Sequence, residues 1–318
     1  MKVVDLFCGC GGMSLGFQNA GFEIVAAFDN WDKAIDIYRK NFKHPIFKCD
    51  LGDLMDFTEI KNFQPEMIIG GPPCQDFSSA GKRDESLGRS DLTVKFANIV
   101  SEVLPKFFVM ENVDRIEKSN AYQKAYQIFK NAGYGLTSTV LDASLCGVPQ
   151  KRKRFFLIGE LNGVDNVFEP YLNANLSEES MTVRDYLGDT LGIEHYYRHP
   201  RNYNRRGIFS IDEAAPTVRG VNRPLPSGYP GHSGDSAPVS DKIRPLTTVE
   251  RSYLQTFPQT FIFEGSKTNL EQMIGNAVPV NLAKYVALSL KDYMCNKKVN
   301  DNFFQMNIFD YNLESTQS

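Results

Sequence analysis

The chain has 318 residues and a formal net charge of −3, with 42% hydrophobic and 23% charged residues. This composition is ordinary for a globular protein of one large or two smaller domains, and it excludes a chain that is mainly disordered. No apolar run approaches the about 18 residues that cross a bilayer, and no signal peptide precedes the first strand-like segment. We therefore expect a cytoplasmic protein with no membrane segment.

The cysteines and histidines argue against a metal centre. The chain has six cysteines, none in a C-x-x-C pair, and four histidines. Structural zinc sites need clustered ligands of these types, so we expect no metal. Unpaired thiols also fit the reducing conditions of a cytoplasm.

The first half of the chain alternates strand-like and helix-like segments. Apolar residues recur at helical spacing between residues 92 and 103, and again between 280 and 293. This alternation predicts an α/β fold with a doubly wound, mostly parallel sheet that helices cover on both faces. The expected strands are 2–6, 23–29, 46–50, 67–71, 107–110, 136–141 and 155–158.

The character of the sequence changes after about Gly163. Asn, Arg, Tyr, Gly and Pro become frequent, and the prolines disfavour long helices. We expect a smaller, irregular domain with short strands there. The expected division is a first domain over 1–163 plus 272–298, the irregular domain over 164–271 and a tail over 299–318.

The irregular domain carries a local excess of positive charge. From His195 to Arg251 there are nine lysines and arginines against five acidic residues, a surplus of four. Such a surplus fits a nucleic-acid-binding patch and a solvated face about equally well.

A glycine-rich turn follows the first expected strand. Gly9, Gly11 and Gly12 let the backbone approach a ligand closely, although their spacing is not G-x-G-x-x-G. Asp29 ends the second strand, where an acid can bind a ribose, and Asp50 ends the third, within reach of an adenine amine. Each feature alone is ordinary turn chemistry. Together they favour a nucleoside-containing cofactor without identifying it.

A stiff loop after the fourth expected strand contains Cys74. Pro72 and Pro73 precede the cysteine and fix its direction. Its thiolate is a candidate nucleophile if nearby cations or backbone amides lower its pKa, and the alternative is a buried structural cysteine. Glu111 follows the fifth strand and is a candidate acid, or else a helix cap or surface carboxylate.

Two arginines form a second candidate group in the run from Gln150 to Arg154. Alternation along a strand places Arg152 and Arg154 on the same face. Two guanidiniums there could bind a phosphate or carbonyl and steady a thiolate, whereas most charge runs are simply solvated.

Six motifs follow one another in a fixed order: 7–12, 71–75 with 77–78, 111–113, 150–154, 244–258 and 275–279. In this order they resemble the motifs of the DNA (cytosine-5) methyltransferase family, bacterial restriction–modification type. The resemblance covers roughly residues 1–160 and 243–295, and the Pro-Pro-Cys loop is its most specific motif. It implies the Rossmann-like fold of enzymes that use S-adenosylmethionine.

The resemblance also implies a set of residues that bind S-adenosylmethionine without a metal. Either Asn30 or Trp31 would cover the adenine. The expected set is Phe7, Gly9, Gly11, Gly12, Asp29, Asn30, Trp31, Asp50, Leu51, Pro72, Asn276 and Val278.

The implied chemistry is nucleophilic. Cys74 would attack carbon 6 of cytosine, Glu111 would contact the ring, and Arg154 with Arg152 would bind the base carbonyl or a phosphate. The target base would be flipped out of the duplex, and the loop from Ser78 to Ser90 would close over it.

The implied partner is double-stranded DNA, which the irregular domain would read as the target-recognition domain. Its candidate contacts are Arg198, Arg201, Arg205, Arg206, Arg219 and Arg223. The enzyme would act as a monomer in the bacterial cytoplasm, associated with the nucleoid when on DNA. A cognate restriction endonuclease, acting separately, is left open as a partner.

Four other functions share some of these sequence features. A tRNA cytosine methyltransferase would share the same chemistry, but the long arginine- and proline-rich insertion favours DNA. A zinc nucleobase deaminase needs a second cysteine after Pro73-Cys74, which the chain lacks. A nicotinamide oxidoreductase explains only the glycine turn. A non-enzymatic DNA-binding protein would not need intact catalytic positions.

Overall fold

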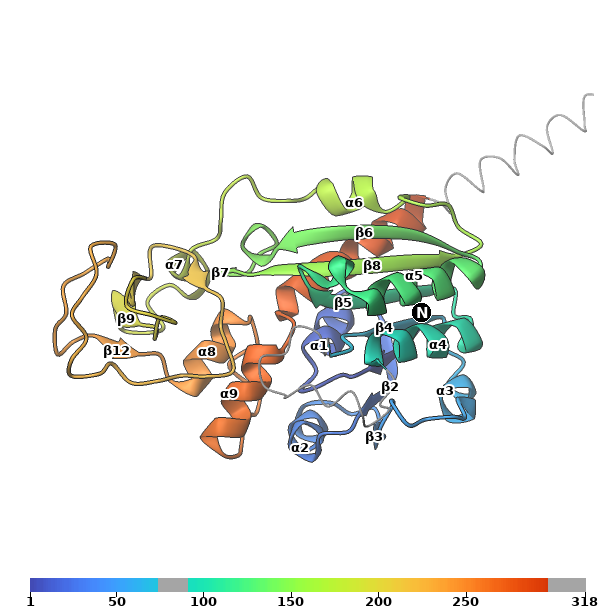
Figure 1. Ribbon diagram of the computed structural model, residues 1–318, viewed down its shortest axis with the longest axis horizontal. Coiled ribbons are helices and arrows are strands. Elements are labelled where there is room, and N and C mark those ends of the chain that lie inside the picture. Colours follow the sequence, from blue (N-terminus) through green and yellow to red (C-terminus); the bar gives the residue numbers. More distant parts are fainter. Residues whose placement is uncertain (74–90, 297–318) are drawn as a thin grey trace, which may run out of the picture.

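The computed structural model describes residues 1–73 and 91–296. Within them lies a seven-stranded sheet in the order β3-β2-β1-β4-β5-β8-β6 (Figure 1). β8 runs antiparallel to β5 and β6, while the other neighbouring pairs are parallel, which confirms the predicted α/β class. The strands are β1 (Lys2–Leu6), β2 (Glu23–Asp29), β3 (Ile46–Lys48), β4 (Met67–Gly70), β5 (Phe107–Val113), β6 (Tyr134–Asp142) and β8 (Lys153–Leu161).

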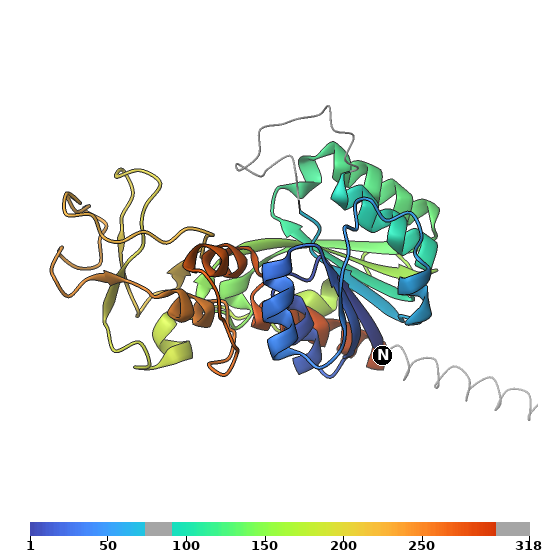
Figure 2. The ribbon, with the colours of Figure 1, turned by 90° about the horizontal axis from the view of Figure 1, so that it is seen from below.

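Helices cover both faces of the sheet, as Figure 2 shows. One face carries α4 and α5, and the other carries α1 and the helix over 280–296. None of the helices in the described ranges is long and apolar enough to cross a membrane. The bounds are α1 (Gly12–Asn19), α2 (Asp32–Asn41), α3 (Thr58–Asn62), α4 (Leu92–Val103), α5 (Asn120–Asn131), α6 (Glu169–Asn173), α7 (Val183–Leu187), α8 (Thr248–Leu254) and α9 (Lys267–Asn276).

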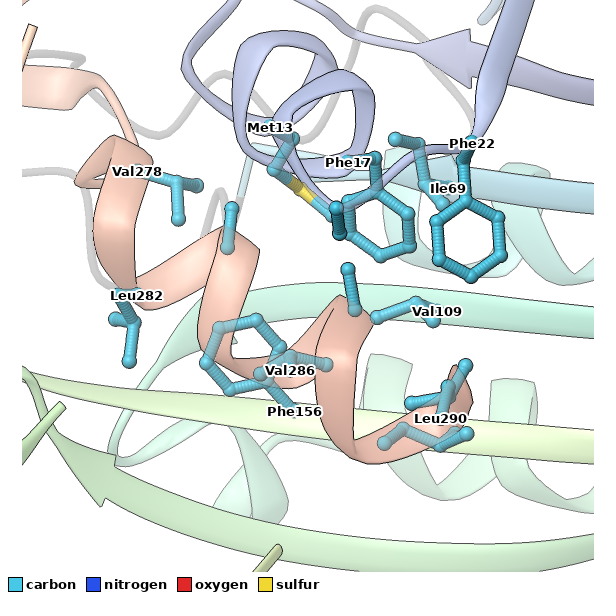
Figure 3. Close-up of a cluster of buried hydrophobic side chains, with 14 of the residues drawn as sticks. Met13, Phe17, Phe22, Ile69, Val109, Phe156, Val278, Leu282, Val286 and Leu290 are labelled. Carbon is cyan, nitrogen blue, oxygen red and sulfur yellow. The ribbon is translucent and has the colours of Figure 1, made fainter. Parts of the chain in front are cut away.

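The sheet is buried on both sides because its strands are apolar at successive positions. On β4, Met67 and Ile69 pack toward α1, whereas Ile68 packs toward α4 and α5. Successive strand residues point to opposite faces, so a continuous apolar run fills two cores at once. Figure 3 shows Phe17 of α1 in the first of these cores, together with Val286 and Leu290 of the 280–296 helix.

Five of the seven strands, β3, β4, β5, β6 and β8, differ from the sequence-based prediction at their ends, and the differences in β3 and β5 concern predicted site residues. β3 ends at Lys48, so Asp50 lies in the turn after the strand. β5 continues three residues past the expected Met110, because its antiparallel pairing with β8 runs on to Val113 and Arg154. Glu111 therefore lies within a strand and not in a loop.

A smaller lobe holds a three-stranded sheet in the order β10-β9-β12, built from β9 (His195–Tyr197), β10 (Ile208–Ser210) and β12 (Arg244–Pro245). β11 (Ala215–Pro216) pairs with β7 (Gln150–Lys151) and so joins this lobe to the main domain. The division of the chain at 163/164 stays a prediction. Phe168 and Leu172, just beyond it, are buried against the main sheet.

The contact between α1 and the 280–296 helix depends on Gly16. A Cβ atom at this position would lie 2.5 Å from the Cβ of Ala283. We expect Gly16→Ala to lower the free energy of unfolding by about 1–3 kcal/mol, measured by urea denaturation, because the added methyl overpacks the contact. In a helix, alanine is normally more stable than glycine by about 1 kcal/mol, so helix propensity alone predicts that Gly16→Ala stabilises the protein. The expected loss of stability therefore has the opposite sign.

The matched control is Gly228→Ala, because nothing lies within 4 Å of a Cβ built there. Its free energy of unfolding should change by no more than about 0.5 kcal/mol. Unchanged or increased stability of Gly16→Ala would show that the two helices are not in close contact.

Candidate active site

The glycine turn after β1 has a backbone that few side chains tolerate. Phe7, Gly9 and Gly11 all have positive φ angles, of 58°, 55° and 94°. A Cβ atom on Gly12 would lie 2.2 Å from the carbonyl oxygen of Val278. Glycine at 12 therefore lets the start of α1 pack directly on the loop before the last helix.

A cavity of about 280 Å³ opens beside this turn. It includes ten of the twelve residues predicted to bind a cofactor: Phe7, Gly9, Gly12, Asp29, Asn30, Trp31, Asp50, Leu51, Asn276 and Val278. The ends of three parallel strands and the loop after α9 thus meet at one cavity, as expected for the carboxyl edge of an α/β sheet.

The other two predicted residues lie outside the lining of the cavity. Gly11 faces α2, where a Cβ would lie 2.4 Å from the ring of Phe42. Pro72 is buried, and its carbonyl oxygen accepts a hydrogen bond of 2.9 Å from Asn112 Nδ2. Both residues shape the loops that line the cavity.

Asp29 and Asp50 hold one end of the cavity together. Asp29 accepts hydrogen bonds of 2.8 Å from the backbone amides of Gly9 and Trp31, and burial raises its pKa. Asp50 accepts from the amide of Gly52 at 3.0 Å and from Asn30 Nδ2 at 3.5 Å. These contacts connect the glycine turn to the ends of β2 and β3, and Asn30 and Trp31 line the cavity beside them.

Glu111 lies at the opposite end of the cavity. Its Oε1 forms an ion pair of 2.9 Å with Arg154 Nε, and both side chains are largely buried. Burial raises the pKa of Glu111, while Arg154 and Arg152 lower it. A carboxyl balanced in this way can hold or release a proton without leaving its place.

Cys74 and the predicted lid from Ser78 to Ser90 lie outside the described residues, apart from the stiff start of their loop. Pro73 and Gly71 line the cavity next to Glu111. The described chain therefore reaches the cavity at the residue that precedes Cys74.

Arg152 has different surroundings from Arg154. It is 1% exposed, and its guanidinium donates to three backbone carbonyls, of Val218, Gly275 and Ala277, at 2.9–3.1 Å. With both Nη groups occupied and Nε buried, the geometry does not support the expected contact of Arg152 with a base or phosphate. It instead joins the edge of the main sheet to the smaller lobe and to the loop after α9.

Two buried glutamines add to the contacts that Arg152 makes between the main domain, the smaller lobe and the loop after α9, which we call the Arg152 seam. Gln150 accepts from the amide of Val218 at 2.8 Å and donates to Gln255 Oε1 at 2.9 Å. Gln255 in turn donates to the carbonyl oxygens of Ile274 and Ala277. The amides thereby satisfy backbone groups that would otherwise be buried without partners.

Arginines crowd a surface of the smaller lobe beside this seam. A hollow of about 310 Å³ is lined by Arg198, Arg201, Arg205, Thr217 and Arg219. Arg198 donates to the carbonyl oxygen of Thr217 at 3.0 Å, and Arg219 donates to that of His199. Burial, with the charge of Arg219, lowers the pKa of Arg198 to about 10.

The other predicted arginines divide into two kinds. Arg206 pairs with Glu213 and lies 4.2 Å above the ring of Phe209, so it is held by its own lobe. Arg201, Arg205 and Arg223 are exposed, and their side chains have no hydrogen-bond or ion-pair partner within residues 1–73 and 91–296. They are the ones available to an anionic partner.

Sequence reasoning missed several residues that line the cavity: Asp5, Cys8, Cys10, Met13, Cys49, Leu92, Met273 and Ala277. Asp5 could have been predicted from the sequence, because it is an acidic residue inside an apolar strand, and such a residue is rarely buried without a function. Within the described residues no cluster of three or more His, Cys, Asp or Glu side chains could hold a metal ion.

A family model and two similar proteins place this chain in the same family. The family model for C-5 cytosine-specific DNA methylases matches residues 1–292. The Type II methyltransferase M.HindV of Haemophilus influenzae is 63% identical over 295 residues, which cover 92% of this chain and 97% of that protein. M.HgiDI of Herpetosiphon aurantiacus is 56% identical, over 92% and 95% of the two chains.

Solved structures share the fold. A putative DNA modification methyltransferase encoded within an E. coli prophage superposes with a TM-score of 0.69 at 24% identity, over 92% of this chain and 99% of that one. The Dnmt2 methyltransferase of S. pombe superposes with a TM-score of 0.68 at 19% identity, over 92% and 98%.

The Arg152 seam has a direct test in Arg152→Lys. A lysine keeps the positive charge, but its single ammonium cannot reproduce the planar fork that spans three carbonyls. We expect the free energy of unfolding to fall by about 2 kcal/mol, because buried carbonyls lose their donors.

The control is Arg115→Lys, since Arg115 is exposed and its side chain has no partner in the described ranges. Chemical denaturation of the two variants side by side gives the comparison. Equal stability would mean that the three carbonyls do not depend on Arg152.

Proposed function

Because this chain belongs to the family of C-5 cytosine-specific DNA methylases, we propose that it transfers a methyl group from S-adenosylmethionine to one short sequence of double-stranded DNA. Membership makes it an enzyme, a DNA (cytosine-5) methyltransferase. The observation that supports the finer proposal best is one cavity that runs from Asp29 and Asp50 to Glu111 and Pro73. A cofactor bound there would have one end beside the loop that carries Cys74.

The residues present fit S-adenosylmethionine. Asp29 and Asp50 offer carboxylates suited to the ribose and the adenine amine, and Trp31 or Asn30 would cover the base. The close contact of Gly12 with Val278 brings the glycine turn and the loop after α9, which form two walls of the cavity, together. Asp5 Oδ1, buried and without a partner in the described ranges, faces the same space. S-adenosylmethionine supplies a methyl group on a positively charged sulfur.

The proposed chemistry assigns three side chains to the cytosine. The thiolate of Cys74 bonds to carbon 6, which makes carbon 5 nucleophilic. Carbon 5 then takes the methyl group, a base or water removes the carbon-5 proton, and the bond between carbon 6 and sulfur breaks to restore the ring double bond and the thiolate. Glu111 contacts ring N3 and the exocyclic amine, and its raised pKa suits it to share a proton with N3. Arg154, paired with Glu111 at 2.9 Å, binds the base carbonyl.

The smaller lobe is the proposed reader of DNA. Three of its arginines have no side-chain partner within the described residues and suit phosphate or guanine contacts: Arg201, Arg205 and Arg223. Arg198 and Arg219 support the backbone beneath them. The target cytosine lies inside a duplex, so we propose that it is flipped into the cavity at a cost of roughly a few kcal/mol.

The biological role that we propose is protection of host DNA in a Type II restriction–modification system, with the enzyme acting as a cytoplasmic, nucleoid-associated monomer. The names of the two similar Type II methyltransferases support the setting. A separately acting endonuclease would be its counterpart.

We propose that the target-recognition domain covers 164–271, between the catalytic segments 1–163 and 272–298, with a tail over 299–318.

The first test is methyl transfer itself. Incubation with radiolabelled S-adenosylmethionine should label unmethylated duplex DNA, and bisulfite sequencing should place the label in one short sequence. Cys74→Ala should abolish labelling, because no other group makes the bond to carbon 6, yet still bind the cofactor in calorimetry.

Cys295→Ala is the matched control, since Cys295 is exposed and should be dispensable. Label in tRNA alone would move the function to RNA modification. Turnover by Cys74→Ala would remove the nucleophile assignment, and labelling of neither nucleic acid would favour a binding protein.

The arginine surface has a separate test. Replacing Arg201 and Arg205 together by alanine should raise the KM for DNA by about tenfold or more and lower the salt dependence of binding by about 0.9 per lost phosphate contact. The KM for S-adenosylmethionine should not change. The matched control replaces Lys118 and Lys124 by alanine, which removes the same charge on the α5 side of the molecule. Equal effects of the two double variants would contradict a local DNA contact.

A further inference from the structure

The last turn of α9 contacts both the cavity and the smaller lobe, and in Figure 1 the helix lies between the lobe and the main sheet. Met273 and Asn276 line the cavity. Gly275 contacts the lobe: a Cβ atom there would lie 2.2 Å from the backbone nitrogen of Gly220 and 2.4 Å from the carbonyl carbon of Arg219. Only glycine allows two backbones to approach so closely. One helical turn is therefore shared by the two proposed sites.

The backbone that Gly275 contacts supports the hollow in the smaller lobe, which we call the arginine hollow. The arginine hollow is lined by Arg198, Arg201, Arg205, Thr217 and Arg219. The side chain of Arg219 donates to the carbonyl oxygen of His199, and that of Arg198 donates to the carbonyl oxygen of Thr217 at 3.0 Å. These two hydrogen bonds connect the segments that form the hollow, so the place of the hollow depends on the backbone at Arg219.

A buried ion pair supports the same backbone from a second element. Arg251 of α8 donates to the carbonyl oxygen of Arg219 and forms an ion pair with Glu271. Glu271 lies on α9, one turn before Gly275, and it also accepts a hydrogen bond of 2.7 Å from Thr248. Arg251 is 6% exposed and Glu271 is 3% exposed. Such a pair keeps its partners in place, because either charge would be costly to bury alone.

The two sides of the contact differ in how firmly they are held. Ile274 of α9 is fully buried in the core, and Gln255 donates to its carbonyl oxygen. On the other side, the chain beyond Gly220 is irregular and mostly exposed or half-buried over 221–243. A side chain added at Gly275 would therefore displace the backbone of the lobe and leave α9 in place.

We infer that Gly275 is a positioning residue for recognition of the DNA sequence. It allows α9 to touch the backbone of Arg219, and this contact sets the distance between the arginine hollow and the cavity that would receive the target cytosine. The inference rests on the proposed methylation of DNA and on the proposed reading of DNA by the smaller lobe. Because a duplex is stiff over a few base pairs, it fixes the spacing that the protein must match.

The expected displacement is large enough to disturb recognition. Atoms that are not bonded pack at about 3.5 Å, so a methyl group on residue 275 would move the backbone of Arg219 and Gly220 by about 1 Å. Binding groups must usually be held to within about 0.5 Å of their productive geometry. Glu111 and Arg154 lie on the main sheet and would keep their places.

Gly275→Ala in the full-length chain tests the inference on a duplex library of random sequence, read by bisulfite sequencing. The unaltered protein should methylate one short sequence. In the variant, methylation of sequences that differ from it at one base pair should rise by about tenfold relative to that sequence. The KM for DNA should rise by about tenfold while kcat changes by less than about threefold, because the reacting groups are unmoved. Calorimetry should show unchanged affinity for S-adenosylhomocysteine.

Gly16→Ala is the matched control. It is the same substitution in another close helix contact, since a Cβ atom there would lie 2.5 Å from that of Ala283, but it lies within the main domain. It should lower stability without changing the discrimination between sequences. The comparison separates a positioning role from a general loss of stability.

Arg251→Lys tests the same backbone through the ion pair. The lysine can still pair with Glu271, but its single ammonium cannot also support the carbonyl oxygen of Arg219. Discrimination against sequences with one altered base pair should fall in the same direction as in Gly275→Ala, by about threefold, because the contact at Gly275 remains. This variant keeps the test decisive if Gly275→Ala does not fold.

Three results would overturn the inference. Unchanged discrimination in both Gly275→Ala and Arg251→Lys would show that α9 does not position Arg219. Equal relaxation in Gly16→Ala would assign the effect to lost stability. A loss of affinity for S-adenosylhomocysteine that matches the loss for DNA would show that α9 moves, so that Gly275 shapes the cavity. If the unaltered protein methylates no DNA, the proposed function fails together with the inference, whereas unaffected variants of an active enzyme remove the inference alone.

Discussion

One buried guanidinium holds together the three parts of the chain that build the site. Arg152 comes from the junction of β7 and β8, and its carbonyl partners lie on the smaller lobe and on the loop after α9. An arginine in such a place loses its hydration, so it is stable only while every segment remains in position. The cavity proposed for the cofactor and the surface proposed for DNA are therefore held in fixed positions relative to each other. Gln150 and Gln255 extend the same constraint through neutral hydrogen bonds.

Charge is separated between the two sides of this seam. The cavity contains carboxyl groups and no cation among the described residues, while the smaller lobe exposes arginines whose side chains have no partner in the part of the chain that the structure describes. A cationic methyl donor and a polyanionic duplex would each meet a surface of opposite charge, and each would be repelled by the other's site. The modest net charge of −3 conceals this arrangement because the two regions offset each other.

The sequence predicts the sheet and most of the cavity because both depend on local patterns. Apolar strands followed by Gly, Asp or Glu mark the strand ends, and Asp29, Asp50 and Glu111 do line one cavity. The predictions are weaker wherever a residue's role depends on distant partners. Arg152 and Arg154 look equivalent in the sequence, yet one meets three carbonyls and the other meets Glu111. The sequence pattern places Asp5 in a strand and predicts no more, because the side chains that form hydrogen bonds beside it come from two later helices and a loop.

The contact of Gly12 with Val278 has a consequence for how the protein is made. One wall of the cavity belongs to β1 and the turn after it, and the facing wall belongs to the loop after α9, which is synthesised much later. A nascent chain therefore cannot form the complete cavity until the loop after α9 has been synthesised, even though domains can begin to fold during synthesis. A truncated product that ends before Asn276 would carry Cys74, Glu111 and the arginines of the smaller lobe, and yet would lack one wall of the cavity proposed for the cofactor.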